Sequence, residues 1–123
     1  MSAPLTAGPI SVRLRWEVRL WLAQRLTAAV LAICVLVHLV TIILAVRGGL
    51  TAAEILARTR GSFAWLSFYG LFVLAVAVHA PIGLRTILAE SFGWRTRSLD
   101  LVMALFALVV LGAGWRTVMG LYR

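Results

Sequence analysis

The sequence predicts an all-α membrane protein with three transmembrane helices. Of its 123 residues, 63% are hydrophobic and only 13% are charged, whereas soluble domains have about half apolar and about a quarter charged residues. A chain this short cannot bury such an apolar excess in its own core, so the excess is expected to face lipid. Three apolar runs are each long enough to cross the roughly 30 Å hydrocarbon core as a helix.

The first transmembrane span is expected over residues 22–46, where an apolar run follows arginines and ends at two glycines. Residues 1–21 are expected to form an N-terminal arm and an interfacial segment. Proline and glycine favour a flexible arm over 1–15, and the tryptophans and arginines that follow suit a membrane interface. The sequence therefore predicts a short N-terminal region followed by one membrane domain over residues 22–123.

The second and third spans are expected over residues 63–88 and 99–119. A polar connector over 50–61 separates the first two spans and is expected to contain a short helix around 52–58. The charged loop 89–98 joins the last two. These connectors leave no room for a separate soluble domain.

The net charge is +8, and all twelve basic residues are arginines. Most lie in the tails and loops between apolar runs, where membrane proteins meet headgroups and soluble partners. No base-reading module appears, so nucleic-acid binding is excluded. Seven arginines are expected on the side of the membrane that holds the N-terminus, and five on the opposite side. The positive-inside rule therefore places the N-terminus on the cytoplasmic side of a bacterial inner membrane.

Both histidines of the chain, His38 and His79, fall inside predicted spans. Ionisable residues within spans are rare and are functional candidates by default. In the first span the polar or soft side chains, taken together with Leu31, step by three and four residues, which places them on one helical face. They are Gln24, Thr27, Cys34, His38 and Thr41. His38 is therefore expected to point inward, either as a ligand or as a packing residue bonded to a neighbouring helix.

His79 is flanked on its own helical face by Ala75 and Gly83. These small residues leave room for a flat group such as a porphyrin, or for a close helix. Neutral imidazole can bind haem iron through one nitrogen and donate a hydrogen bond with the other. Arg25 and Arg85 lie near the same membrane edge, where arginine side chains can pair with the anionic propionates of a haem.

The two histidines are expected at different depths. His38 lies thirteen residues past Arg25, or about 20 Å along a helix, and His79 lies six residues before Arg85, or about 9 Å. The first two spans run antiparallel, so both depths are measured from one membrane face. The difference of roughly 10 Å predicts that these histidines do not bind the same haem.

Two segments resemble the cytochrome b anchor subunits of succinate dehydrogenase and fumarate reductase. The segment from His79 through Gly83 and Arg85 to Glu90 is similar to the HxxxGxR(x)4D motif of that family, in which the histidine is an axial ligand of haem b. Gln24-Arg25-Leu-Thr27 resembles its HRxSG segment. The resemblance covers about residues 16–120, including the layout of three spans, but the first-span histidine of the family is replaced by glutamine here.

The resemblance implies a non-catalytic anchor subunit whose three helices form half of a larger helical bundle. It implies one or two haems b shared with a second three-span subunit or a second copy, with His79, and for a second haem His38, as axial ligands of iron. Gly83, Arg25 and Arg85 would contact the cofactor, and Gln24, Arg25 and Thr27 would contact a quinone substrate. A flavoprotein and an iron–sulfur subunit would be the other partners.

Two other interpretations stay open. The chain can be a haem-free anchor of the same kind of complex, with His79 as a packing or quinone-contact residue. It can also be a small oligomeric transporter or assembly subunit, although transporters usually carry a central intramembrane carboxylate. All four acidic residues fall at span ends or in loops, which argues against transport.

Overall fold

The computed structural model describes residues 8–123, and this range contains four α-helices and no strand. The helices are α1 (Pro9–Arg47), α2 (Ala52–Thr59), α3 (Phe63–Phe92) and α4 (Arg97–Tyr122). Three of them, α1, α3 and α4, are long and apolar enough to cross a membrane. The predicted all-α fold with three transmembrane helices is therefore confirmed, and each predicted span lies inside one helix.

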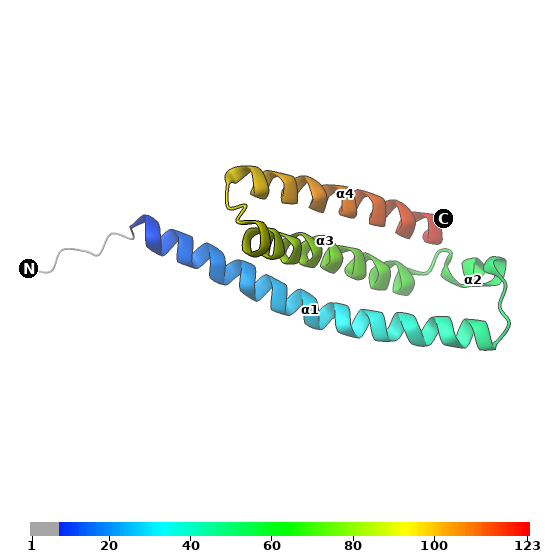
Figure 1. The fold of residues 1–123 in the computed structure, drawn as a ribbon. Coiled ribbons are helices and arrows are strands. Elements are labelled where there is room, and N and C mark those ends of the chain that lie inside the picture. Colours follow the sequence, from blue (N-terminus) through cyan, green and yellow to red (C-terminus); the bar gives the residue numbers. More distant parts are fainter. Residues whose placement is uncertain (1–7) are drawn as a thin grey trace, which may run out of the picture.

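The three long helices are arranged with α3 in the middle. Figure 1 shows α1 and α4 on opposite sides of α3, and α2 beside the C-terminal end of α4. Few hydrophobic side chains are buried, while large apolar side chains are exposed along all three long helices. The buried ones are Cys34, Ala75, Ala77, Leu99, Met103 and Val118. So thin a core leaves most of the apolar surface for lipid and for partner helices.

The first helix begins earlier than the sequence predicts. A flexible arm was expected over 1–15, but α1 already begins at Pro9, and only residues 1–7 lie outside the described residues. Proline suits the first helical position, because its φ angle is helical and the N–H it lacks has no partner there. With 39 residues, α1 is about 58 Å long. Its N-terminal end extends past the ends of α3 and α4 (Figure 1).

The connector between α1 and α3 is built by local signals. Gly49 adopts a left-handed conformation (φ +64°) after the last turn of α1, and α2 follows with a capping box. In this box Glu54 accepts hydrogen bonds from the backbone N–H and the hydroxyl of Thr51, at 2.7 and 2.8 Å. These bonds lower the pKa of the Glu54 carboxyl below its ordinary value. The short helix predicted around 52–58 is therefore confirmed.

The loop between α3 and α4 is shorter than expected. It was predicted over 89–98, but α3 continues to Phe92 and α4 begins at Arg97. Gly93 ends α3 in the left-handed conformation (φ +66°) that glycine adopts without strain. The short loop holds α3 and α4 antiparallel and side by side.

Candidate functional site

The polar face predicted for the first span is the face of α1 that packs on α3. Gln24, Thr27, His38 and Thr41 are half-buried and Cys34 is buried, while most residues between them are exposed. The three-and-four spacing therefore identified the α1–α3 interface correctly.

The α1–α3 interface brings Thr27 of α1 against His79 of α3. The Thr27 Oγ1 lies 3.3 Å from the His79 Nδ1. The same hydroxyl lies 2.6 Å from the carbonyl oxygen of Ala23, one turn earlier on α1. Within residues 8–123 the His79 Nε2 has no hydrogen-bond partner, so this nitrogen is available to an external ligand.

One turn away on the same interface, Gln24 lies over Gly83. A Cβ atom built on Gly83 would be 3.0 Å from the Gln24 Nε2, so the absence of a side chain at Gly83 lets α1 approach closely. The Gln24 Oε1 is buried and has no hydrogen-bond partner among the described residues. The space beside Gly83 is thus occupied by the neighbouring helix α1, which was one of the two expectations for this residue. The contact of Gly83 with a porphyrin stays a prediction.

The two arginines expected near a cofactor have different surroundings. Arg85 donates from Nε to Asp100 of α4 at 2.8 Å, and its Nη2 lies 3.6 Å from the Glu17 carboxylate of α1. This guanidinium therefore joins all three long helices at one end of the bundle. Arg25 is exposed and lies 5.2 Å from the ring centroid of Trp21. Among the hydrogen bonds of residues 8–123, none joins the Arg25 side chain to His79 or Thr27.

Sequence reasoning missed both carboxylates beside Arg85. The available signal was that Asp100 and Glu17 fall at the same membrane edge as Arg85. Their pairing with Arg85 depends on how the three helices pack.

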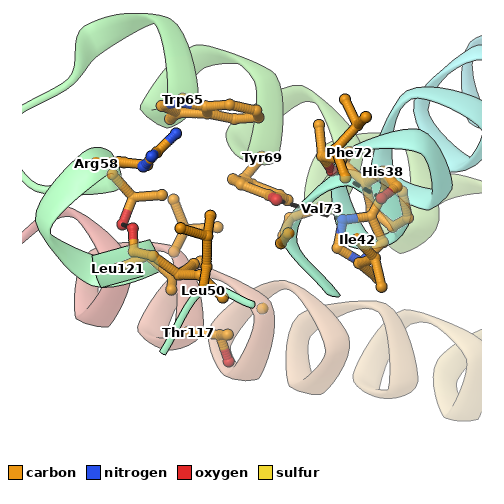
Figure 2. Close-up of a pocket in the computed structure, with 17 residues that line it drawn as sticks. His38, Ile42, Leu50, Arg58, Trp65, Tyr69, Phe72, Val73, Thr117 and Leu121 are labelled. Atoms are coloured by element: carbon orange, nitrogen blue, oxygen red, sulfur yellow. Dashed lines mark hydrogen bonds between the residues drawn. The ribbon is translucent and has the colours of Figure 1, made fainter. Parts of the chain in front are cut away.

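A second hydroxyl–imidazole contact lies farther along the same interface. The Nδ1 of His38 lies 3.3 Å from the hydroxyl oxygen of Tyr69 on α3 (Figure 2). The His38 ring also packs edge-on against Tyr69 and Phe72, with ring centroids 5.7 and 6.1 Å apart. No pattern in the sequence selects Tyr69, because its proximity to His38 follows from the register of two antiparallel helices.

The His38 ring lines a cavity of about 870 Å³ between the four helices. In Figure 2, Arg58 and Trp65 lie at one end of this cavity, and His38 and Phe72 lie at the other. Most of the lining is apolar. It comprises His38, Thr41, Ile42, Leu44, Ala45, Leu50, Ile55, Arg58, Thr59, Trp65, Tyr69, Phe72, Val73, Gly114, Thr117, Val118 and Leu121. Its size and its few polar groups are typical of small-molecule and cofactor sites.

In a comparison with protein families, residues 8–114 match the model described as succinate dehydrogenase/fumarate reductase transmembrane subunit. The matched residues make up most of the chain. The chain belongs to this family. Membership in this family implies association with the flavoprotein and iron–sulfur subunits of such a complex. Comparisons with curated proteins and with solved structures gave no match.

The residues around His79 fit one side of the haem that this anchor family implies. An axial histidine binds iron through one nitrogen and usually donates a hydrogen bond from the other, and His79 has its Nδ1 against Thr27 and its Nε2 free. No group of three or more His, Cys, Asp and Glu side chains comes together within residues 8–123. A haem bound here would therefore take one imidazole, that of His79, from this chain.

The two hydroxyl–imidazole contacts lie at different levels of the anchor. Thr27 and His38 are eleven residues apart on α1, which corresponds to about 16 Å along the helix axis. Since Thr27 contacts His79, the two imidazoles are separated by roughly that rise. The separation agrees with the expectation that they lie at different depths, and it is larger than the roughly 10 Å expected from the arginine positions.

Proposed function

We propose that this chain is the haem b-binding anchor of a succinate:quinone oxidoreductase and helps electrons pass between the iron–sulfur subunit and quinone. The observation that supports this most strongly is the state of His79. It lies within a membrane-spanning helix, it is held at Nδ1 by Thr27, and its Nε2 is free. An imidazole in the membrane interior is costly without a partner, and iron is the partner that this arrangement suits.

The second axial ligand of that haem must come from another polypeptide, because His38 lies at a different level. A second three-span subunit, or a second copy of this chain, supplies it and completes the bundle of which this chain is half. The apolar surfaces exposed along all three long helices agree with such a partner. The membrane is the bacterial inner membrane, with the N-terminus in the cytoplasm.

Arg25 and Arg85 are proposed to face the propionates of this haem. Arg85 is already paired with Asp100 and Glu17, so a propionate would join a network that contains two carboxylates. Arg25 is exposed and forms no salt bridge within the part of the chain that the structure describes, which makes its guanidinium the easier one to recruit.

Quinone contacts are proposed for Gln24, with Arg25 and Thr27 close by in sequence. The buried Gln24 Oε1 lacks a hydrogen-bond partner within residues 8–123, and an unpaired buried acceptor is unfavourable. The hydroxyl of a reduced quinone is a donor that would satisfy it. Gly83, which faces Gln24, would shape the same space.

A second haem is proposed for His38. Its Nδ1 is bonded to Tyr69 and its ring lines the cavity of about 870 Å³. Arg58, at the far end of this cavity (Figure 2), carries the positive charge that propionates require. The alternative is one haem only, with His38 as a packing residue.

Haem content of the intact complex tests these assignments. We expect one or two haems b per flavin in the purified complex, loss of the first in His79→Ala, and loss of only the second in His38→Ala. A substitution on the exposed face of α4, Leu108→Ala, serves as the matched control. A wild-type complex with full quinone reductase activity and no haem would establish the haem-free anchor. Full haem retention in His79→Ala would remove His79 as a ligand.

A further inference from the structure

The Thr27 side chain has a single hydroxyl hydrogen, and the distances from Oγ1 to its neighbours indicate which of them receives it. Its Oγ1 lies 2.6 Å from the Ala23 carbonyl oxygen and 3.2 Å from that of Gln24. A carbonyl can only accept, so the hydroxyl must donate to the α1 backbone. The lone pairs of Oγ1 are what it presents to His79. The contact of 3.3 Å with Nδ1 is then a hydrogen bond only if Nδ1 carries the proton.

This direction fixes the protonation pattern of the ring. A neutral imidazole has one N–H and one bare nitrogen, so a proton on Nδ1 leaves the lone pair on Nε2. A hydroxyl that already donates is polarised and accepts more strongly, which reinforces the choice. We propose that Thr27 is a positioning residue that holds His79 in the Nδ1–H tautomer and so presents a bare Nε2 to haem iron. The inference rests on the proposed function.

The proposed role differs from the quinone contact expected for Thr27. Its one hydrogen is used by the Ala23 carbonyl, so Thr27 has no donor left for a quinone carbonyl. The close approach of Gln24 to Gly83, one turn away on the same interface, keeps α1 near enough for the contact with His79.

His38 provides an internal comparison. Its partner is the phenol of Tyr69, and this phenol also has the side chain of Thr41 as a hydrogen-bonding neighbour. The phenol can therefore either donate to His38 or accept from it. Of the two histidines, His79 is therefore the one whose hydroxyl partner fixes the tautomer.

The first test reads the tautomer without haem. The full chain is prepared haem-free in lipid with ¹⁵N-labelled histidine, and the ring nitrogens are observed by NMR. We expect wild-type His79 to show a protonated Nδ1 and a bare Nε2. Thr27→Val keeps the shape of the side chain but removes the acceptor, so His79 should lose its single tautomer. Thr27→Ser should restore it, and the signals of His38 should not change in any variant.

The second test uses the assembled complex. An Nδ1–H hydrogen bond makes the ligand more basic and favours ferric iron. Thr27→Val should therefore raise the haem midpoint potential and weaken haem retention by about 10- to 100-fold in a competition with an apo-globin. Thr27→Ser should behave like wild type in both measurements.

The outcomes separate the two proposals. An unchanged His79 tautomer in Thr27→Val, or an unchanged haem potential, would overturn the positioning role while leaving His79 as the ligand. Full haem retention in His79→Ala would overturn the ligand assignment, and the tautomer measurement would still report on Thr27.

Discussion

Replacing Gly114 with alanine should destabilise the contact between α3 and α4. A Cβ atom at Gly114 would lie 2.6 and 2.9 Å from the two methyl carbons of Val73 and 3.3 Å from its Cβ. Carbon atoms prefer separations of about 3.5–4.0 Å, so the helices would have to separate by roughly 1 Å. Overpacking of this kind costs about 1–3 kcal/mol.

The same helix provides matched controls. Gly112 and Gly120 also lie in α4, and a Cβ at either one meets nothing within 4 Å. Alanine is better than glycine within a helix by about 1 kcal/mol, and this gain is common to all three substitutions. The stability of Gly114→Ala should therefore fall about 1–3 kcal/mol below that of Gly112→Ala, which isolates the contact with Val73.

The measurement is unfolding of the full chain by SDS in bicelles, followed by circular dichroism. Val73→Ala removes both methyl carbons, so the double variant Val73→Ala/Gly114→Ala should recover much of the loss relative to Val73→Ala alone. If Gly114→Ala proves as stable as Gly112→Ala, the close α3–α4 contact is not present in the folded chain, and the reasoning fails.

Three further predictions concern polar contacts and helix approach. Gly83→Ala should lengthen the contact between Thr27 and His79, because the new Cβ would lie 3.0 Å from the Gln24 Nε2. The purified variant complex should then retain less haem, and unchanged haem retention would contradict the prediction. A double-mutant cycle on Arg85 and Asp100, whose side chains are 25% and 57% exposed, should give a coupling free energy of about 0.2–1 kcal/mol. A coupling of zero would contradict a stabilising role for this ion pair. Hydrogen bonds from Thr51 lower the pKa of the Glu54 carboxyl. The stabilisation that Glu54 gives to α2 is therefore complete above the pKa of this carboxyl in the unfolded chain, and it is lost as the pH falls through the lower pKa of the folded chain. The protection of the amides in the first turn of α2, measured as exchange relative to an unfolded peptide at the same pH, should therefore fall at acid pH, and Glu54→Gln should abolish that fall.

The fold could be read from the sequence because bilayer thickness and helical periodicity are strong constraints. A run of apolar residues long enough to cross the membrane allows few structures other than a helix. The three-and-four spacing from Gln24 to Thr41 then defined the face of α1 that meets α3. Both inferences depend only on residues close together along the chain, which is why they succeeded.

The partners of the site residues could not be read in the same way. Tyr69 contacts His38, and Asp100 contacts Arg85, only because separate helices pack in one register. No local pattern specifies that register. The early start of α1 was missed for a different reason, since Pro9 was interpreted as part of an arm although proline also begins helices.

The register of α1 against α3 is fixed at two points about 16 Å apart. Sliding α1 by one helical turn would displace it by about 5.4 Å and would separate Thr27 from His79 and His38 from Tyr69 at the same time. Any event that shifts one helix along the other, such as the arrival of a partner subunit, would thus alter both imidazoles together. The two levels of the anchor are mechanically linked, although no side chain joins them directly.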